Sequence, residues 1–269
     1  MRLFFTLLLV GGCTSESVDT VSKVEDTGTP DSGGSNETGI DTGPTDNGTV
    51  TGSVVTFDGN TPTGMAVTFC QTVCYSGKTT GGGQFEFADV PAGDYKLDAI
   101  GEGLNDDWGH IRVRVLLDAL QTVALPFPLF VPHQPDVQLV TYGQRSSLTF
   151  DGVTISIDGA SLIEEPSDGE TTLAVSAGLV LRDDVPAFWD VEPTFAVSFL
   201  PFATEVLGAF DIDVVDAMGE FAGDEFDVYA VGEHGDTEGP IGTAIRDGDT
   251  LTAMGIKPTV LTWLLFVPG

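Results

Sequence analysis

The tripeptide Asp-Thr-Gly occurs twice near the start of the chain, opened by Asp26 and by Asp41. Two carboxylates can share one proton and activate water for peptide hydrolysis, provided that both are buried side by side on braced turns. Residues 14–50 cannot build such a site, because they contain no aromatic residue and a single basic one, Lys23. A segment made mostly of Thr, Ser, Gly, Asp, Glu, Asn and Pro buries too little apolar surface to offset the entropy of ordering. It predicts a disordered linker and not a proteolytic dyad.

The linker follows the sequence MRLFFTLLLVGGC, in which Arg2 precedes an apolar run that ends at Val10. This run is too short to span a bilayer and is typical of an export signal. The end of the run, Val10-Gly11-Gly12-Cys13, resembles the lipobox of bacterial lipoproteins, where the signal is cut before the cysteine and the sulfur carries diacylglycerol. The resemblance implies a signal peptide over residues 1–12 and a lipid anchor on Cys13. An ordinary secretory signal with an incidental cysteine is the open alternative.

The residue after Cys13 is Thr14 and not an aspartate, so the usual signal for retention in the inner membrane is missing. The resemblance therefore implies the outer membrane of a Gram-negative bacterium, with the protein facing the periplasm or the cell surface. Residues 13–48 are then a lipidated, acidic and disordered linker, and the membrane is a partner through the anchor.

The charge balance excludes one class of partner. The 269 residues contain 10 Lys and Arg against 41 Asp and Glu, and removing residues 1–12 leaves nine basic residues and a net charge of −32. A chain this acidic is repelled by nucleic acid phosphates and by anionic lipid headgroups. The sequence predicts no nucleic acid partner.

Beyond the linker, short alternating runs are broken by Gly, Pro, Asn and Asp about every ten residues, which predicts strands and turns without an amphipathic helix. One set of runs lies between residues 50 and 117, and a second set lies between 147 and 267. Between them stands PFPLFVPHQPD, whose four prolines suit a connector better than a central strand. The predicted fold class is therefore all-β, with two tandem β-sandwich modules at residues 49–130 and 134–269.

The first module resembles the carboxypeptidase regulatory-like domain, a small prealbumin-like sandwich, in the segments GTVTGSVVTFDGNTPTGMAVTFC and TTGGGQFEFADVPAGDYKLDAI. Two phenylalanines that are two residues apart face one side of a strand, and a Pro-x-Gly turn returns a tyrosine and a leucine to the same side. The resemblance implies core and corner roles without chemistry for Gly83, Phe85, Phe87, Val90, Pro91, Gly93, Tyr95 and Leu97.

Cys70 and Cys74 in the sequence CQTVC close a tight hairpin within this module. A zinc site would need two further ligands that the neighbouring sequence does not offer, and redox pairs have two intervening residues more often than three. In an oxidising compartment the spacing predicts a local disulfide.

The second module resembles ZU5-like sandwiches of bacterial surface proteins in GVTISIDGASL and in TFAVSFLPFATEVLGAFDIDVVD. The alternation of Phe195, Val197 and Phe199 predicts a strand with one buried and one exposed face. The alternation of Phe210, Ile212 and Val214 predicts the same. Trp263, in an apolar run, is predicted to lie in the core.

The sequence contains no recognisable catalytic or metal constellation. The histidines His110, His133 and His234 lack metal-clamp spacing, and no Gly-x-Ser-x-Gly motif is present. The acidic loops GEHGDTEG and GLNDDWG lack the oxygen ladder of an EF-hand, so solvated turns are the default and calcium stays open. The sequence predicts a protein that is not an enzyme and that uses no cofactor and no metal.

These features together predict an exported, membrane-anchored scaffold with a structural or adhesive role. A carbohydrate-binding module is the alternative, and an enzyme accessory subunit or hydrolase comes after it. A glycan or a surface protein would be the partner. The candidate ligand contact is Trp108, because polar and turn residues surround it in LNDDWGH and its ring could stack on a sugar. The alternative is that Trp108 covers the end of the first core.

We predict that Cys13 carries the anchor. Labelled palmitate should enter the wild-type protein and not Cys13→Ala, because only the cysteine thiol can accept the lipid in a lipobox. Equal labelling of both proteins would contradict the prediction.

Overall fold

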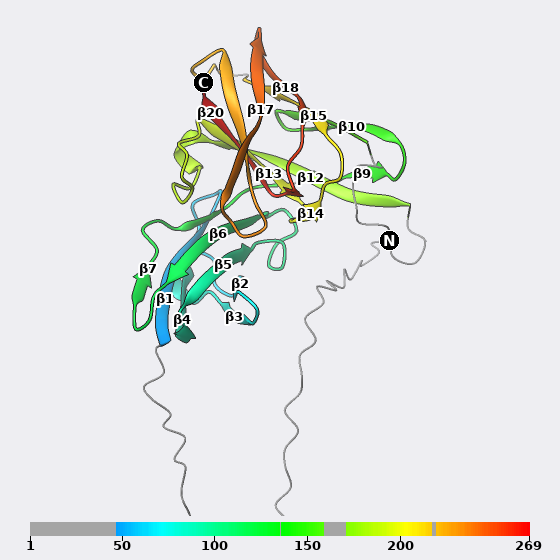
Figure 1. Cartoon of the computed structure of the whole chain (residues 1–269). Helices are drawn as coiled ribbons and strands as arrows, with labels where there is room; N and C mark the ends of the chain where they lie inside the picture. Colours follow the sequence, from blue (N-terminus) through cyan, green and yellow to red (C-terminus); the bar gives the residue numbers. More distant parts are fainter. Residues whose placement is uncertain (1–46, 135, 159–170, 217–218) are drawn as a thin grey trace, which may run out of the picture. The chain divides into compact units, whose positions relative to one another are not determined.

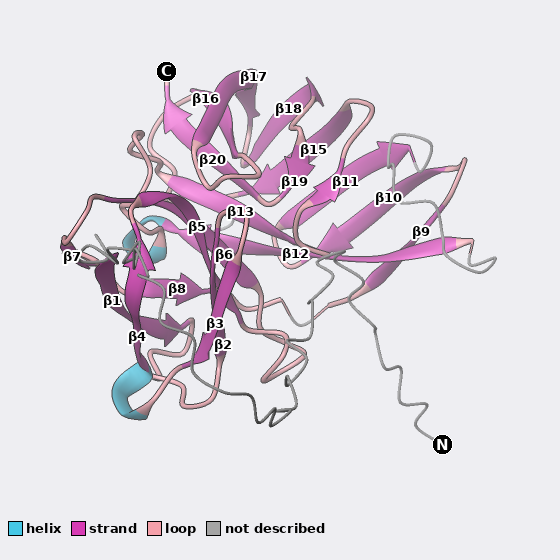
Figure 2. Ribbon diagram, turned by 60° about the horizontal axis from the view of Figure 1, so that its bottom comes forward, coloured by secondary structure: helices cyan, strands magenta, loops and turns pink. Residues whose placement is uncertain are grey.

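The computed structural model describes residues 47–134, 136–158, 171–216 and 219–269, so the predicted signal, Cys13 and most of the linker lie outside it. The described residues are almost entirely strands, which confirms the all-β fold class (Figures 1 and 2). The elements are β1 (Asn47–Thr56), β2 (Ala66–Cys70), β3 (Cys74–Lys78), η1 (Gly81–Gly83), β4 (Gln84–Pro91), β5 (Gly93–Ile100), β6 (His110–Leu117), β7 (Thr122–Ala124), β8 (Leu129–Val131), β9 (Gln138–Thr141), β10 (Arg145–Phe150), β11 (Val153–Asp158), β12 (Thr172–Leu181), η4 (Arg182–Asp184), β13 (Phe195–Leu200), β14 (Thr204–Glu205), β15 (Phe210–Val215), β16 (Glu225–Val231), β17 (Thr237–Asp247), β18 (Thr250–Ile256), β19 (Val260–Leu261) and β20 (Trp263–Pro268).

Strands β1–β8 form two sheets that share one apolar core. One sheet has the order β4-β1-β7, with β8 also paired to β1, and the other has the order β3-β2-β5-β6. Alternating side chains of β4 and β5 point into the core, as predicted: Phe85, Phe87, Tyr95 and Leu97 are all buried. The rings of Phe69 and Tyr95 stack with centroids 4.3 Å apart, so this half has a packed sandwich core of its own.

The segment Pro91–Gly93 is a corner between the two sheets and not a hairpin turn within one sheet. β4 pairs with β1, whereas β5 pairs with β2 and β6. The hydroxyl of Tyr95 donates a hydrogen bond to the carbonyl oxygen of Pro91 at 2.8 Å, which ties the corner to the returning strand.

Two sequence boundaries differ from the predictions. β1 begins at Asn47, so residues 47 and 48 belong to a strand and not to the linker. The predicted connector contains β8, which pairs in parallel with β1 and is buried. Proline is excluded only from positions that must donate to the ladder, and Pro128 and Pro132 flank the three paired residues.

Strands β9–β13, β15–β18 and β20 form one ten-stranded sheet in the order β10-β11-β15-β18-β17-β16-β20-β13-β12-β9. The sheet curls over its own core, and its two end strands meet where the side-chain amide of Gln138 in β9 donates to the carbonyl oxygen of Thr149 in β10. The amide oxygen of Gln138 also accepts from the Thr149 N–H at 3.4 Å. Curling lets one continuous sheet enclose a core, as the two sheets of a sandwich do.

Strands β13 and β20 of this sheet are buried on both faces. In β13, Phe195, Val197 and Phe199 face the core of the curled sheet, but Ala196 and Ser198 are buried as well. The prediction of one exposed face is therefore wrong for β13, because β1–β8 and their loops cover the second face. It is confirmed for β15, whose even-numbered residues are buried while the intervening ones are partly exposed.

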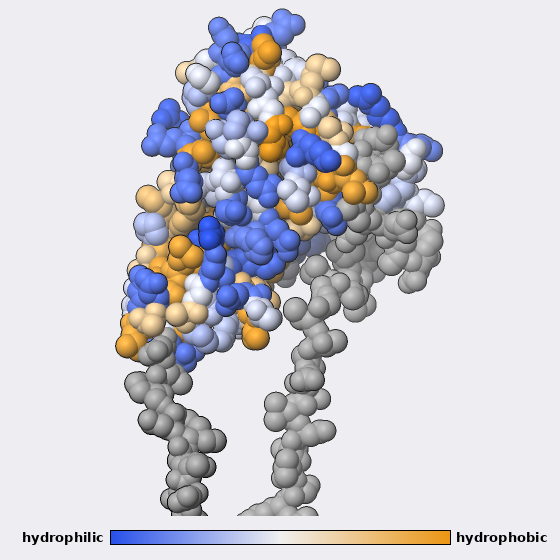
Figure 3. All heavy atoms as spheres, in the orientation of Figure 1, coloured by the Kyte–Doolittle hydropathy of each residue, from blue (hydrophilic) through white to orange (hydrophobic). Residues whose placement is uncertain are grey.

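The second face of β13 and β20 belongs to the same apolar cluster as the core of β1–β8. Trp263 is fully buried there, as predicted, and its indole N–H donates to the carbonyl oxygen of His110 in β6 at 2.8 Å. Residues 43–269 accordingly form one compact unit. The surface drawn in Figure 3 is mainly hydrophilic, with apolar residues in small separate groups.

The turn between β16 and β17, which belongs to the acidic loop GEHGDTEG, packs onto β6. Gly235 in this turn has a φ of +81°, and a Cβ atom there would lie 2.6 Å from the backbone carbon of Val113. Both the left-handed conformation and the close approach require glycine. We call β1–β8 the first half of the compact unit and β9–β20 the second half. The loop, which belongs to the second half, therefore helps to hold the two halves together.

Replacing Gly235 with alanine should reduce the free energy of unfolding by at least about 2 kcal/mol more than replacing Gly248, measured by urea denaturation. Gly248 is the matched control because it also has a positive φ, +66°, but nothing lies within 4 Å of its Cβ position. Backbone strain alone costs about 1 kcal/mol at either position. Equal losses would show that the contact with Val113 is unimportant.

Candidate functional site

The structure pairs Cys70 and Cys74 in a disulfide, as the sequence predicts. The two cysteines are opposite each other at the end of the β2–β3 hairpin. The bond links β2 to β3 at the end of the hairpin and connects no other elements. Cys13, the predicted lipid attachment site, lies outside the described residues, as do Asp26 and Asp41.

Trp108 is half-buried and packs against the core shared by β1–β8 and the second face of the curled sheet. Its backbone forms an isolated bridge with His133, whose ring stacks on Phe57 with the centroids 4.2 Å apart. Phe57 and His133 are exposed. The position of Trp108 favours the covering role, and the aromatic surface beside it belongs to Phe57 and His133.

The other aromatic and histidine candidates lie apart. Trp189 and Trp263 are both buried, with ring centroids 5.4 Å apart. His110 is buried in β6, whereas His133 and His234 are exposed. In the described ranges, no group of three or more His, Cys, Asp or Glu side chains is placed to hold a metal ion. No helix among the same residues is long and apolar enough to cross a membrane.

A polar cluster of Asp98, His110, Arg112 and Phe202 lies where β5 and β6 meet the second half, and we call it the junction cluster. The Arg112 guanidinium donates to both oxygens of the Asp98 carboxylate, at 2.6 and 2.9 Å. A third donor of Arg112 reaches the carbonyl oxygen of Glu233 at 3.0 Å, in the turn that also contains Gly235. The ring of Phe202 stacks on His110 at 4.0 Å and lies under the guanidinium at 5.1 Å.

In the junction cluster, burial and the neighbouring groups shift the pKa of Asp98 in opposite directions. Burial alone would raise the pKa of Asp98, but the His110 ring and the two hydrogen bonds from Arg112 outweigh it and hold the pKa well below its usual range. The Nε2 atom of His110 is 3.7 Å from Asp98, too far for a good hydrogen bond. Asp98 is therefore an ionised, fully paired carboxylate that joins the two halves through Arg112.

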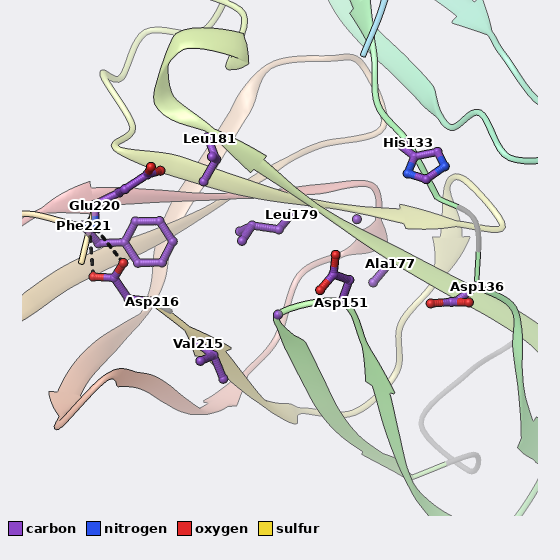
Figure 4. A pocket seen from close by; sticks show the side chains of 12 residues that line it. His133, Asp136, Asp151, Ala177, Leu179, Leu181, Val215, Asp216, Glu220 and Phe221 are labelled. Atoms are coloured by element: carbon purple, nitrogen blue, oxygen red, sulfur yellow. Dashed lines mark hydrogen bonds between the residues drawn. The ribbon is translucent and has the colours of Figure 1, made fainter. Parts of the chain in front are cut away.

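A groove of about 670 Å³ opens along β12 on the side of the curled sheet that faces its core (Figure 4). Side chains of β12, of β15 and of nearby loops form its apolar part, and carboxylates lie at its rim. The groove is lined by His133, Asp136, Asp151, Gly152, Ala177, Gly178, Leu179, Leu181, Val215, Asp216, Glu220 and Phe221.

The groove carboxylates differ in how well they are satisfied. Asp216 accepts hydrogen bonds from the backbone N–H groups of Glu220 and Phe221, at 2.7 and 3.1 Å, and from Arg246 at 3.2 Å. Asp136, Asp151 and Glu220 are exposed, and none of their side-chain carboxylates has a hydrogen-bond or ion-pair partner within the described part of the chain. Three carboxylates are thus left to accept hydrogen bonds or positive charge from outside.

Sequence reasoning missed both the groove and the junction cluster. Asp98 and Arg112 are 14 residues apart and Phe202 is far from both, so only the pairing of β5 with β6 and the docking of the second half join them. One local signal existed: β6 reads His-Ile-Arg-Val, with polar residues in a strand whose first four residues are all buried. No comparable signal marks Asp136, Asp151 and Glu220 among so many acidic residues.

Comparisons with known proteins give distant similarity only. No protein-family model matches the chain, and no curated protein matches it. Among solved structures, the TIE protein of Bacillus anthracis is 12% identical over 80% of this chain, with a TM-score of 0.29. The major pilin SpaD of Corynebacterium diphtheriae is 11% identical over 82%, with a TM-score of 0.28.

A protein described as a DUF3823 family member from Bacteroides ovatus is 10% identical over 83% of this chain and 82% of its own, with a TM-score of 0.23. This chain spans 32% of the TIE protein and 55% of SpaD. All three TM-scores are below 0.5, so these similarities support no argument about function.

The buried pair Asp98–Arg112 should matter far more to stability than the exposed pair Asp94–Arg114. Asp98→Asn leaves a buried guanidinium without its counter-charge and should cost about 3–5 kcal/mol at pH 7 in urea unfolding. Asp94→Asn breaks a pair that is nearly half exposed to water, and it should cost little. Similar losses would contradict the assignment of Asp98 as the joining carboxylate.

The same pair predicts a pH dependence. The pKa of Asp98 is lower in the folded protein than its ordinary value of 3.8, so its stabilisation is present above about pH 4. This contribution is lost as the pH falls below that value toward the folded pKa. The stability difference between wild type and Asp98→Asn should therefore shrink as the pH is lowered from 5 to 3.

Proposed function

We propose that this chain is an exported, lipid-anchored and non-enzymatic scaffold at the bacterial surface or in the periplasm. The observation that carries the proposal is the apolar cluster that runs from the core of β1–β8 to the second face of β13 and β20. Two halves that share a core move as one body, whereas modules joined only by a linker move independently. A rigid block on a soluble, acidic stalk suits a spacer or an adhesive support.

The anchor and the family interpretation belong to the same proposal. Cys13 would hold the protein at the outer membrane, and residues 13–48 would separate the compact unit from the lipid. The first half, residues 49–130, is interpreted as a carboxypeptidase regulatory-like sandwich. Its corner at Pro91, tied by Tyr95, and its buried phenylalanines support this interpretation. The second half, residues 134–269, is interpreted as a ZU5-like module.

Carbohydrate binding is the second candidate function. The rings of Phe57 and His133 stack at an exposed position, and the half-buried Trp108 lies beside them through its bridge with His133. Sugar rings stack on such aromatic surfaces. On a glycan array, Phe57→Ala should lose more binding than Trp108→Ala if this surface is the platform, provided that both variants keep the wild-type melting temperature.

A scaffold that is one rigid block should unfold in one transition. Trp108, Trp189 and Trp263 all lie in or against the shared cluster, so their fluorescence reports on the junction, whereas circular dichroism reports on all strands. We expect the two signals to give the same urea midpoint, because neither half can lose its share of the core alone. Fluorescence that changes at a clearly lower urea concentration would mean that the junction opens first, and it would contradict the rigid scaffold.

A further inference from the structure

The disulfide between Cys70 and Cys74 joins a buried residue to an exposed one. Cys74 in β3 is exposed, whereas Cys70 in β2 is buried. The two residues are directly opposite each other in the hairpin, so the bond runs across it from one strand to the other. Exposed disulfides exchange with thiols more readily than buried ones. The end of the bond on β3 is therefore the accessible one.

The position of β3 in its sheet determines from which side a reagent can approach. A thiolate attacks one sulfur of a disulfide and expels the other, in line with the bond that breaks. Beyond Cys74 this line leaves the sheet, because β3 is the end strand and pairs only with β2 among the described residues. Beyond Cys70 the line meets β5, which pairs with the other side of β2. Attack on Cys74 is thus open, and attack on Cys70 is blocked.

Lys96 lies beside the sulfur that such an attack expels. It is directly opposite Cys70 in the pairing of β2 with β5, so the two side chains are neighbours on one face of the sheet. The Lys96 side chain is 25% exposed, and its ammonium is 3.7 Å from the Glu233 carboxylate, which is too far for a good hydrogen bond. A lysine near a cysteine favours the thiolate form. The ammonium of Lys96 can therefore stabilise the negative charge that develops on Cys70.

The sandwich does not depend on this bond. Cys70 and Cys74 are only four residues apart, so the bond restricts the unfolded chain little. All five residues of β2 pair with β3 on one side and with β5 on the other. These hydrogen-bonded ladders remain when the bond between the sulfur atoms opens. The disulfide can therefore be exchanged in the folded protein.

We propose that Cys74 is a site of reversible S-thiolation by a small-molecule thiol. The thiolate of the reagent forms a bond to the Sγ atom of Cys74, the bond between the two Sγ atoms breaks, and its electron pair leaves on Cys70. Cys70 then takes up the proton that the reagent lost. One disulfide replaces another, so the step needs no oxidant or reductant besides the thiol. In the reverse step, the Cys70 thiolate attacks the mixed disulfide at Cys74 and releases the reagent.

The probe is 2-mercaptoethanol, a neutral thiol, added to the folded full chain. N-ethylmaleimide stops the reaction after short times, because it caps the Cys70 thiol before that thiol can attack the mixed disulfide. Tandem mass spectrometry then assigns the adduct to one cysteine, and the adduct on Cys74 should exceed that on Cys70 at least about tenfold. Equal adducts on the two residues would overturn the proposal. Exchange that begins only at urea concentrations where circular dichroism shows unfolding would overturn it as well.

Three variants test the role of Lys96. Lys96→Met should slow the exchange about fivefold at low salt, because the departing thiolate loses its counter-charge. The matched control, Lys78→Met, removes the same charge from β3 opposite Ala66 and should stay within about twofold of wild type. Glu233→Gln keeps the Lys96 ammonium and removes its acidic neighbour, so the exchange should not slow. An unchanged rate in Lys96→Met, or equal slowing in Lys96→Met and either of the other variants, would overturn the role of Lys96.

Discussion

The burial of β13 and β20 on both faces is the constraint on which the rest of this structure depends. One face closes the core of the curled sheet, and the other completes the core of β1–β8. Strands in this position must be almost entirely apolar, as FAVSFL and WLLFVP are. The few polar groups that remain there need partners: the indole N–H of Trp263 bonds the His110 carbonyl, and the Ser198 hydroxyl accepts from the Gln134 amide at 2.8 Å.

This arrangement buries the positive charge of Arg112, which is paired with the carboxylate of Asp98. β6 enters the junction with its first four residues buried, so a guanidinium on this strand is removed from water. Its donors are used by Asp98 and by the carbonyl of Glu233, and the ring of Phe202 covers it. Such a group contributes little net stability against an apolar alternative, but it is costly when one partner is missing. The pairing therefore favours the arrangement of the two halves in which Arg112 has these partners, and it destabilises arrangements in which a partner is missing.

The groove arises from a mismatch in strand length. β12 has ten residues and β9 has four, so the curled sheet closes beside the first part of β12 and stays open beside the second. In the closed part, the side-chain amide of Gln138 in β9 forms hydrogen bonds with the C=O and the N–H of Thr149 in β10. In the open part, side chains that belong to the core, such as Leu179, reach the surface beside unpaired carboxylates. The groove is thus a consequence of how the sheet closes.

The sequence by itself determined the all-β class, the core positions of β4 and β5, the local disulfide and the burial of Trp263, because each depends on alternation, turn residues or short spacing. Tertiary structure alone decided the burial of the second face of β13. Alternation of apolar residues predicts one buried face, but it does not show that β1–β8 cover the other face as well. Tertiary structure also made β8 a strand despite its flanking prolines, and it brought Asp98, Arg112 and Phe202 together. Those contacts join residues 14 to about a hundred positions apart, and pairing between elements so distant leaves no periodic trace in the chain.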